Sequence, residues 1–185
     1  MDVAPHVVGS ILLATSYAAV GAEWQTVPET SAVAMYATTQ GTTFRGVFAA
    51  YSAEIDFDVE NPEAGRIVGV VKTASVDTED SQTNTYIRGY LQVDEYPEAR
   101  FESTTIQATD EGYRASGELR LAGHQKPVTM DFTFVPGSDA AVPASSAMFT
   151  ASMTINRFDF DIASDVNIDQ AGQDVIVYIE LNLER

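Results

Sequence analysis

From Trp24 onward, β-branched and aromatic residues alternate with polar residues over short spans that turn-forming residues separate. This period of two is typical of strands that bury one face and expose the other. The pattern predicts eight strands, at residues 31–38, 43–58, 65–75, 98–108, 112–122, 127–136, 147–157 and 174–184. Eight antiparallel strands are the number at which a closed barrel can just hold one small ligand.

One segment, residues 77–97, departs from this alternation. Ile87 and Leu91 are four residues apart, as on one face of a helix, and Pro97 would close such a helix. After residue 22, no other segment has a helical pattern, and the sequence contains no internal repeat. The chain is therefore predicted to be an antiparallel all-β domain with one short inserted helix.

The stretch GTTFRGVFAAYSAEIDFD, residues 41–58, has apolar side chains on both faces. One face carries Phe44, Gly46, Phe48 and Ala50, and the other carries Val47, Tyr51, Ile55 and Phe57. Because neither face is purely polar, we expect the strand to bend or bulge near Ala49–Ala50 and to serve both sides of the barrel wall. Gly46 and Ala50 are predicted to leave gaps that a solid core would fill. The pattern thus favours the wall of a container over a filled core.

The composition fits a single domain with a sizeable core, because the chain has 185 residues, of which 45% are hydrophobic. It has no cysteine, which excludes disulfides, thiolate metal sites and cysteine nucleophiles. The formal net charge is −17, from 27 acidic and 10 basic residues. Nucleic acids and anionic membrane surfaces should repel such a chain, so we expect no nucleic-acid partner.

Residues 1–22 contain an apolar run that ends in small residues. The run is shorter and more interrupted than a membrane span, and Val20-Gly21-Ala22 is typical of a signal-peptide cleavage site. Asp2 stands where a signal peptide usually has a basic residue, so a fragment of a longer chain and a folded N-terminal segment remain alternatives. We expect a signal peptide or leader at 1–22, one domain at 23–185, and a periplasmic or secreted protein.

No Gly-x-Ser-x-Gly, phosphate-binding glycine loop or His-Glu-x-x-His motif occurs in the chain. His124 falls between two predicted strands, where an exposed turn histidine is favoured over a catalytic base. Asp159 and Asp161 would share one face of a strand, which leaves a paired-acid hydrolase as an alternative. A solvated acidic face fits so acidic a chain better. We therefore expect no catalytic residue and no metal site, and the protein is predicted not to be an enzyme.

Several stretches resemble the YceI-like family of polyisoprenoid-binding, lipocalin-like bacterial proteins. The similarity covers nearly all of residues 23–185 in order, and its most specific part is Gly-Glu-Leu, then Gly, then Lys-Pro-Val-Thr. The stretches that carry it are FRGVFAAYSAEIDFDVENPEAG, VVKTASVDT, YPEARFESTTI, GYRASGELRLAGHQKPVTMDF, SMTINRFDFDI and QDVIVYIELNLE.

The resemblance implies an eight-stranded antiparallel lipocalin-like β-barrel with a long apolar cavity. Such a cavity would bind an isoprenoid lipid, either an isoprenoid quinone such as ubiquinone or a polyprenyl phosphate. The resemblance implies no catalytic activity and no required cofactor. It allows transient contact with a membrane or a membrane redox protein, and either a monomer or a homodimer.

Two positions depart from the family pattern. Thr83-Asn84-Thr85-Tyr86-Ile87 stands where relatives often have Arg-Asp-x-His-Leu, so charged groups that would seat a polar head are lost and a neutral quinone is favoured over a diphosphate. The acidic net charge argues the same way. Asp161 replaces the usual Gly. Arg157 matches the pattern and is predicted to tie strands together through a carboxylate rather than to contact the ligand.

Alternate apolar positions on the predicted strands supply the candidate ligand-binding residues. Trp24 is predicted to plug or cover one barrel end. Tyrosines and a leucine on the helix and its exit are candidates for the mouth, where a ring with one polar end is at home. The full set of candidates is Val33, Met35, Phe44, Phe48, Val71, Tyr86, Tyr90, Leu91, Tyr96, Phe101, Leu119, Phe132, Phe134, Phe149, Met153, Val177 and Ile179.

Two classes of function remain open. The leading prediction is non-catalytic binding, storage or transport of an isoprenoid lipid. The alternative is an accessory interaction module of a secreted or redox assembly, in which the barrel is filled and the acidic outer face binds a partner.

Overall fold

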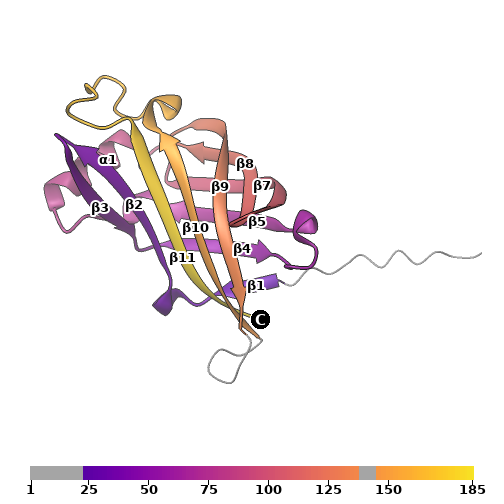
Figure 1. Cartoon of the computed structure of the whole chain (residues 1–185). Helices are drawn as coiled ribbons and strands as arrows, with labels where there is room; N and C mark the ends of the chain where they lie inside the picture. The colour runs from indigo at the N-terminus through magenta and orange to yellow at the C-terminus, as the bar shows by residue number, and fades with distance from the viewer. Residues whose placement is uncertain (1–22, 138–144) are drawn as a thin grey trace, which may run out of the picture.

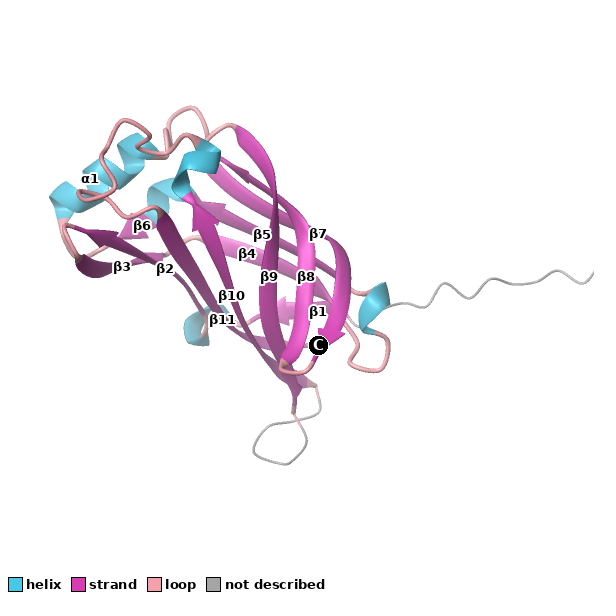
Figure 2. Ribbon diagram, turned by 45° about the horizontal axis from the view of Figure 1, so that its top comes forward, coloured by secondary structure: helices cyan, strands magenta, loops and turns pink. Residues whose placement is uncertain are grey.

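The computed structural model describes residues 23–137 and 145–185, and the leader predicted at residues 1–22 lies outside this range. One α-helix, α1 (Ser81–Tyr90), accompanies eleven strands and four 3-10 turns (Figures 1 and 2). The strands are β1 (Glu23–Thr26), β2 (Ala32–Thr39), β3 (Thr42–Phe48), β4 (Tyr51–Asp56), β5 (Arg66–Lys72), β6 (Val76–Asp77), β7 (Glu98–Thr109), β8 (Gly112–Leu121), β9 (His124–Pro136), β10 (Ser146–Asn156) and β11 (Asp174–Glu184). The 3-10 turns are η1 (Pro28–Thr30), η2 (Pro62–Ala64), η3 (Thr73–Ser75) and η4 (Arg157–Phe160).

Eight of these strands form a closed antiparallel ring in the order β1-β4-β5-β7-β8-β9-β10-β11, which the β1–β11 pairing closes. The predicted eight-stranded barrel with one helix is therefore confirmed. The ring is not uniform along its length, because β11 pairs with β1 near its C-terminal end and with β2 over residues 176–180. Strands β2, β3 and β6 thus extend the sheet beyond β11 at the end where α1 lies (Figure 1).

The bend predicted at Ala49–Ala50 is present and separates β3 from β4. The backbone N–H of Ala49 donates to the Ser75 carbonyl at 3.2 Å, and that of Ala50 donates to the Ser75 hydroxyl at 3.1 Å. The break satisfies both donors and changes which side chains point inward, since Phe48 before it and Ile55 after it are both buried. This one long segment can therefore contribute even-numbered apolar residues to the interior before the break and odd-numbered ones after it.

Helix α1 forms where the helical spacing predicted it, but it ends seven residues before Pro97. The Asp80 carboxylate caps its start by accepting from the Thr83 N–H at 2.6 Å. At its other end, Gln92 has a φ of 50°, and the N–H groups of Gln92 and Val93 bond to the carbonyls of Gly89 and Arg88. This left-handed termination, rather than the proline, stops the helix. No helix among the described residues is long and apolar enough to cross a membrane.

Local backbone needs explain parts of the Gly-Glu-Leu…Gly pattern. A Cβ at Gly117 would lie 2.2 Å from the Glu102 carbonyl oxygen, next to a bulge between Ser103 and Thr105 in β7. Gly123 has a φ of 77° and follows Ala122 at 47°, as in a two-residue hairpin turn. His124 begins β9 just after this turn and is half-buried rather than exposed. Its Nδ1 lies 2.9 Å from the Ala122 carbonyl oxygen.

Candidate ligand-binding cavity

One end of the barrel is filled by aromatic rings. Phe57 is at the centre of this closed end, with ring centroids 4.8 Å from Tyr113, 5.2 Å from Phe132 and 5.1 Å from Phe134. Trp24 lies at this end, as predicted, and its indole N–H donates to the Phe57 carbonyl at 3.1 Å. The closed end is therefore a solid core with no room for a ligand.

The other half of the barrel encloses a cavity of about 700 Å³. This volume is within the range of small-molecule sites, and the walls are mainly apolar. The cavity lies between the inward faces of the strands, and α1 and the segment after β10 flank its outer end. The container predicted from residues 41–58 is thus present in one half of the molecule.

Fourteen of the seventeen candidate residues line this cavity. They are Val33, Met35, Phe44, Phe48, Val71, Tyr86, Tyr90, Leu91, Phe101, Leu119, Phe149, Met153, Val177 and Ile179. Their contact with a ligand stays a prediction. These residues surround the cavity because alternation along the strands turns them inward, and helical spacing does the same on α1.

Three candidate residues lie elsewhere. Phe132 and Phe134 have the predicted inward orientation but belong to the aromatic closed end, because alternation gives direction and not height along the barrel. Tyr96 packs its ring on the β8–β9 turn, where a Cβ at Gly123 would be 2.6 Å from the Tyr96 Cζ. Its hydroxyl donates to the Glu95 carboxylate at 2.9 Å.

The small residues that make room for the cavity are not the ones the sequence indicated. A Cβ at Gly46 would meet Met35, Thr78 and Val76 at 3.2 to 3.3 Å, so this site is already filled. Ala50 is exposed at the strand break. The free space lies instead beside Gly69 of β5, where a Cβ would meet no atom within 4 Å.

The outer end of the cavity, called the mouth here, is formed by α1 and by the mouth segment, residues 157–174. Four apolar side chains of these two elements are more than a third exposed: Tyr86 and Tyr90 on α1, and Phe158 and Ile168 on the mouth segment. Thr39 at the tip of β2 donates its hydroxyl to the Gln170 carbonyl at 2.7 Å. The β2–β3 hairpin and the mouth segment are therefore joined directly.

Arg157 organises the mouth segment from inside. Its side chain is 3% exposed, and its Nε donates to the Gly172 carbonyl at 3.0 Å. Its Nη1 donates to the carbonyls of Ile162 and Ala163, and its Nη2 to those of Val166 and Ala171. The predicted tie to a carboxylate is wrong, because neutral backbone carbonyls take all five N–H groups. These bonds hold an irregular loop in one conformation.

The expected acidic pair is also placed differently. Asp159 lies in η4 and Asp161 ends it, so the two carboxylates are not side by side on a strand. Asp161 has φ 53° and ψ 27°, in the left-handed region. This conformation accounts for the glycine usual in relatives, and aspartate is among the few residues that tolerate it.

The cavity residues that sequence reasoning missed include two groups with a clear structural cause. Ala53 and Ile55 follow the predicted bend. Before the bend the even-numbered residues point inward, and after it the odd-numbered residues do, so applying this change at Ala49–Ala50 would have found both. The other group, Ile162, Ala163, Val166 and Gly172, lies in the mouth segment. This segment has no periodicity, and the carbonyls that fix it to Arg157 have no sequence signature.

Comparisons with known proteins agree with this geometry. The model of the YceI-like domain matches residues 24–183. A UPF0312 protein of Yersinia pestis is 31% identical over 137 residues, which cover 73% of this chain and 71% of that protein.

Two solved structures have the same fold. BcnA of Burkholderia cenocepacia has a TM-score of 0.76 at 22% identity, covering 85% of this chain and 98% of that one. A polyisoprenoid binding domain from Saccharophagus degradans, implicated in plant cell wall breakdown, has a TM-score of 0.62 at 16% identity, covering 87% and 97%. The family-model match over residues 24–183, together with the 31% identity to the Yersinia protein, shows that the present chain belongs to the YceI-like domain family.

Proposed function

We propose that this protein binds an isoprenoid lipid in the barrel cavity, without catalysis, and stores or transports it. The observation that carries the proposal is the apolar cavity of about 700 Å³, which a filled interaction module would not need. The Saccharophagus domain of the same fold, described as polyisoprenoid-binding, supports the ligand class. An isoprenoid quinone such as ubiquinone and a polyprenyl phosphate are the two candidate ligands.

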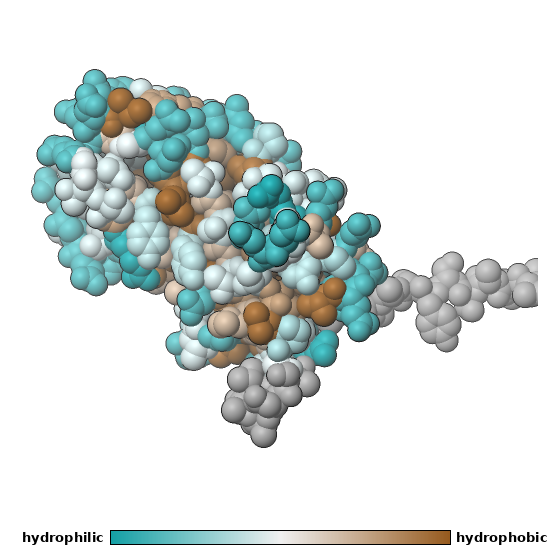
Figure 3. Space-filling view, in the orientation of Figure 1, coloured by the Kyte–Doolittle hydropathy of each residue, from teal (hydrophilic) through white to brown (hydrophobic). Residues whose placement is uncertain are grey.

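The driving force is the removal of the lipid tail from water. Each buried methylene-sized group contributes about 0.8 kcal/mol, and measured affinities saturate near about 20 kcal/mol, so tail length has to be set by the size of the cavity. In Figure 3, hydrophilic residues surround a face of mixed hydropathy, on which strongly apolar side chains appear as separate spots. A soluble carrier of this kind would suit the periplasmic or secreted location that we expect from the leader predicted at residues 1–22.

Organic extraction of the purified full chain, followed by mass spectrometry, tests the proposal. Protein from cells rich in quinones should release an isoprenoid lipid, and delipidated protein should take up added ubiquinone. Trp24 is in the closed end, so a Phe48→Trp variant supplies a reporter in the cavity wall for the uptake measurement. Protein that carries no lipid and refuses ubiquinone would refute the proposal.

A matched pair of variants tests the location. Met153 lines the cavity and its neighbour Ser152 faces outward on the same strand. Met153→Arg should abolish uptake because it brings a charge into the apolar space, whereas Ser152→Arg should leave uptake unchanged. Equal uptake by both variants would move the site away from this cavity.

A further inference from the structure

The charged groups around the mouth bear on which head group a bound lipid carries. Arg157 is the one lysine or arginine among the described residues that line the cavity. A phosphate is ordinarily bound by free N–H groups of such a side chain, often two at a time. Arg157 can therefore bind a phosphate only if some of its N–H groups have no other acceptor.

All the N–H groups of Arg157 already have acceptors. The five N–H groups of a guanidinium lie in its plane, and five backbone carbonyls of the mouth segment already accept from them. The Phe158 ring covers one face, with its centroid 4.0 Å from the Arg157 Cζ. The negative ends of the carbonyl dipoles also point at the cation and weaken its field in the cavity. Arg157 is thus a structural cation and not a phosphate ligand.

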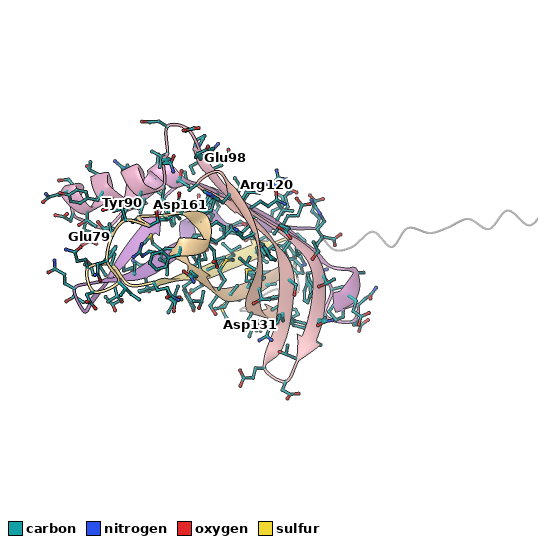
Figure 4. All side chains as sticks on the ribbon, turned by 90° about the horizontal axis from the view of Figure 1, so that it is seen from above. Glu79, Tyr90, Glu98, Arg120, Asp131 and Asp161 are labelled. Carbon is teal, nitrogen blue, oxygen red and sulfur yellow. The ribbon has the colours of Figure 1, made fainter. Side chains whose placement is uncertain are left out.

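Most of the remaining charged groups around the mouth are acidic and repel anions. Five exposed aspartates lie in the mouth segment, at positions 159, 161, 165, 169 and 174. Five exposed acids lie next to α1 in the sequence: Asp77, Glu79, Asp80, Asp94 and Glu95. Figure 4 shows Glu79, Tyr90 and Asp161 at the end of the barrel that α1 covers. Arg88 of α1 is the exposed cation beside these acids, and its Nη2 donates to the Val76 carbonyl at 3.1 Å.

We propose that the mouth makes this cavity selective for isoprenoid lipids with an uncharged head, and that it excludes phosphate-headed lipids with the same tail. This inference rests on the proposed function and specifies its ligand class. A phosphate at the mouth would lose hydration, gain no free N–H group from Arg157 and face carboxylates on both sides. An alcohol or a quinone head is uncharged, so it loses less hydration, needs no cationic donor and is not repelled by the carboxylates, while the tail gains the same burial in both cases.

A tail-matched pair of probes tests the selectivity, namely farnesol and farnesyl monophosphate bound to the delipidated full chain at low and high salt. Farnesol should bind roughly tenfold more tightly at low ionic strength, and the difference should narrow with salt because screening weakens the repulsion. Equal or tighter binding of the phosphate would overturn the inference and leave the proposed function standing. Binding of neither probe would count against the proposed function itself.

Charge-removing variants assign the effect to the mouth. Asp161→Asn with Asp169→Asn removes two charges there, and asparagine tolerates the left-handed backbone of position 161. Asp110→Asn with Glu111→Gln removes two charges from the exposed β7–β8 turn as the matched control. The mouth variant should strengthen farnesyl monophosphate binding several-fold without changing farnesol binding, and the control should change neither. Equal effects of the two variants would show that net charge alone, and not the mouth, disfavours the phosphate.

Discussion

Strands β8 and β9 contribute inward side chains to both the closed end and the cavity end of the barrel, and the two ends differ in the size of such side chains. At the closed end, the rings of Phe132 and Phe134 have their centroids 5.2 and 5.1 Å from that of Phe57. In the cavity half, Ala53 of β4 pairs with Gly69 of β5, and no atom occupies the space beside Gly69. The difference teaches that a container requires no change of fold. Small residues at a few inward positions leave the space, while a solid aromatic core holds the ring closed.

Truncating a phenylalanine should therefore cost far more at the closed end than in the cavity wall. Phe57→Ala removes a ring that is 1% exposed and contacts three other rings, so we expect a loss of about 3–5 kcal/mol in the free energy of unfolding. Phe48→Ala should cost about half as much, because one side of that ring already faces the cavity and has fewer contacts to lose.

Urea unfolding of both variants and the parent, all delipidated, gives this comparison directly. The variants are matched because each converts a buried phenylalanine to alanine on one of the two consecutive segments of residues 41–58. Equal losses would mean that the wall at Phe48 is as tightly packed as the core at Phe57, and the distinction between the two halves would fail.

The same contrast separates what the sequence could predict from what it could not. Strands β7 to β11 follow their predicted spans closely, because alternation is a local signal that a half-buried wall enforces. Alternation also placed Phe149 and Phe132 on the inner face, yet only Phe149 lines the cavity. Height along the barrel depends on strand stagger, and stagger is a property of the closed ring. The conformation of the mouth segment could not be predicted, because Arg157 is bound by backbone carbonyls and every residue has one.

Loss of Arg157 should loosen the mouth and leave the closed end intact. Arg157→Met removes five hydrogen bonds to the carbonyls of the mouth segment, and we expect a loss of about 2–3 kcal/mol in stability, because these bonds involve a charged donor and solvent can reach part of the released loop. Hydrogen exchange should rise in residues 157–174 and stay low in the strands around Phe57. A uniform rise along the chain would indicate that Arg157 supports the whole barrel.

A larger side chain that fills part of the cavity should weaken lipid binding. Gly69→Leu projects a side chain into free space in the wall, and we expect lipid affinity to fall about tenfold because the tail loses that volume. Gly89→Leu is the control, since Gly89 also has no atom within 4 Å of a built Cβ but is exposed on α1. Titration of ubiquinone into both variants tests this. Unchanged affinity in Gly69→Leu would show that the tail does not reach β5.

The smallest expected effect is a loss of stability of α1 at acidic pH that the closed end does not share. The side-chain amide of Asn84 donates to Asp77 and lowers the pKa of that carboxyl, and the Thr83 N–H lowers the pKa of Asp80 in the same way. Since the folded pKa values are below the ordinary values near 4, the stabilisation is complete above about pH 4 and is lost as the pH falls through the folded pKa values. The protection of α1 amides from hydrogen exchange, relative to their intrinsic rate at each pH, should therefore fall as the pH drops below about 4, before that of the strands around Phe57. The double variant Asp77→Asn and Asp80→Asn keeps oxygen acceptors at both positions but cannot titrate, so it should flatten this response. An equal loss of protection in that variant would assign the acid sensitivity to groups other than these two carboxylates.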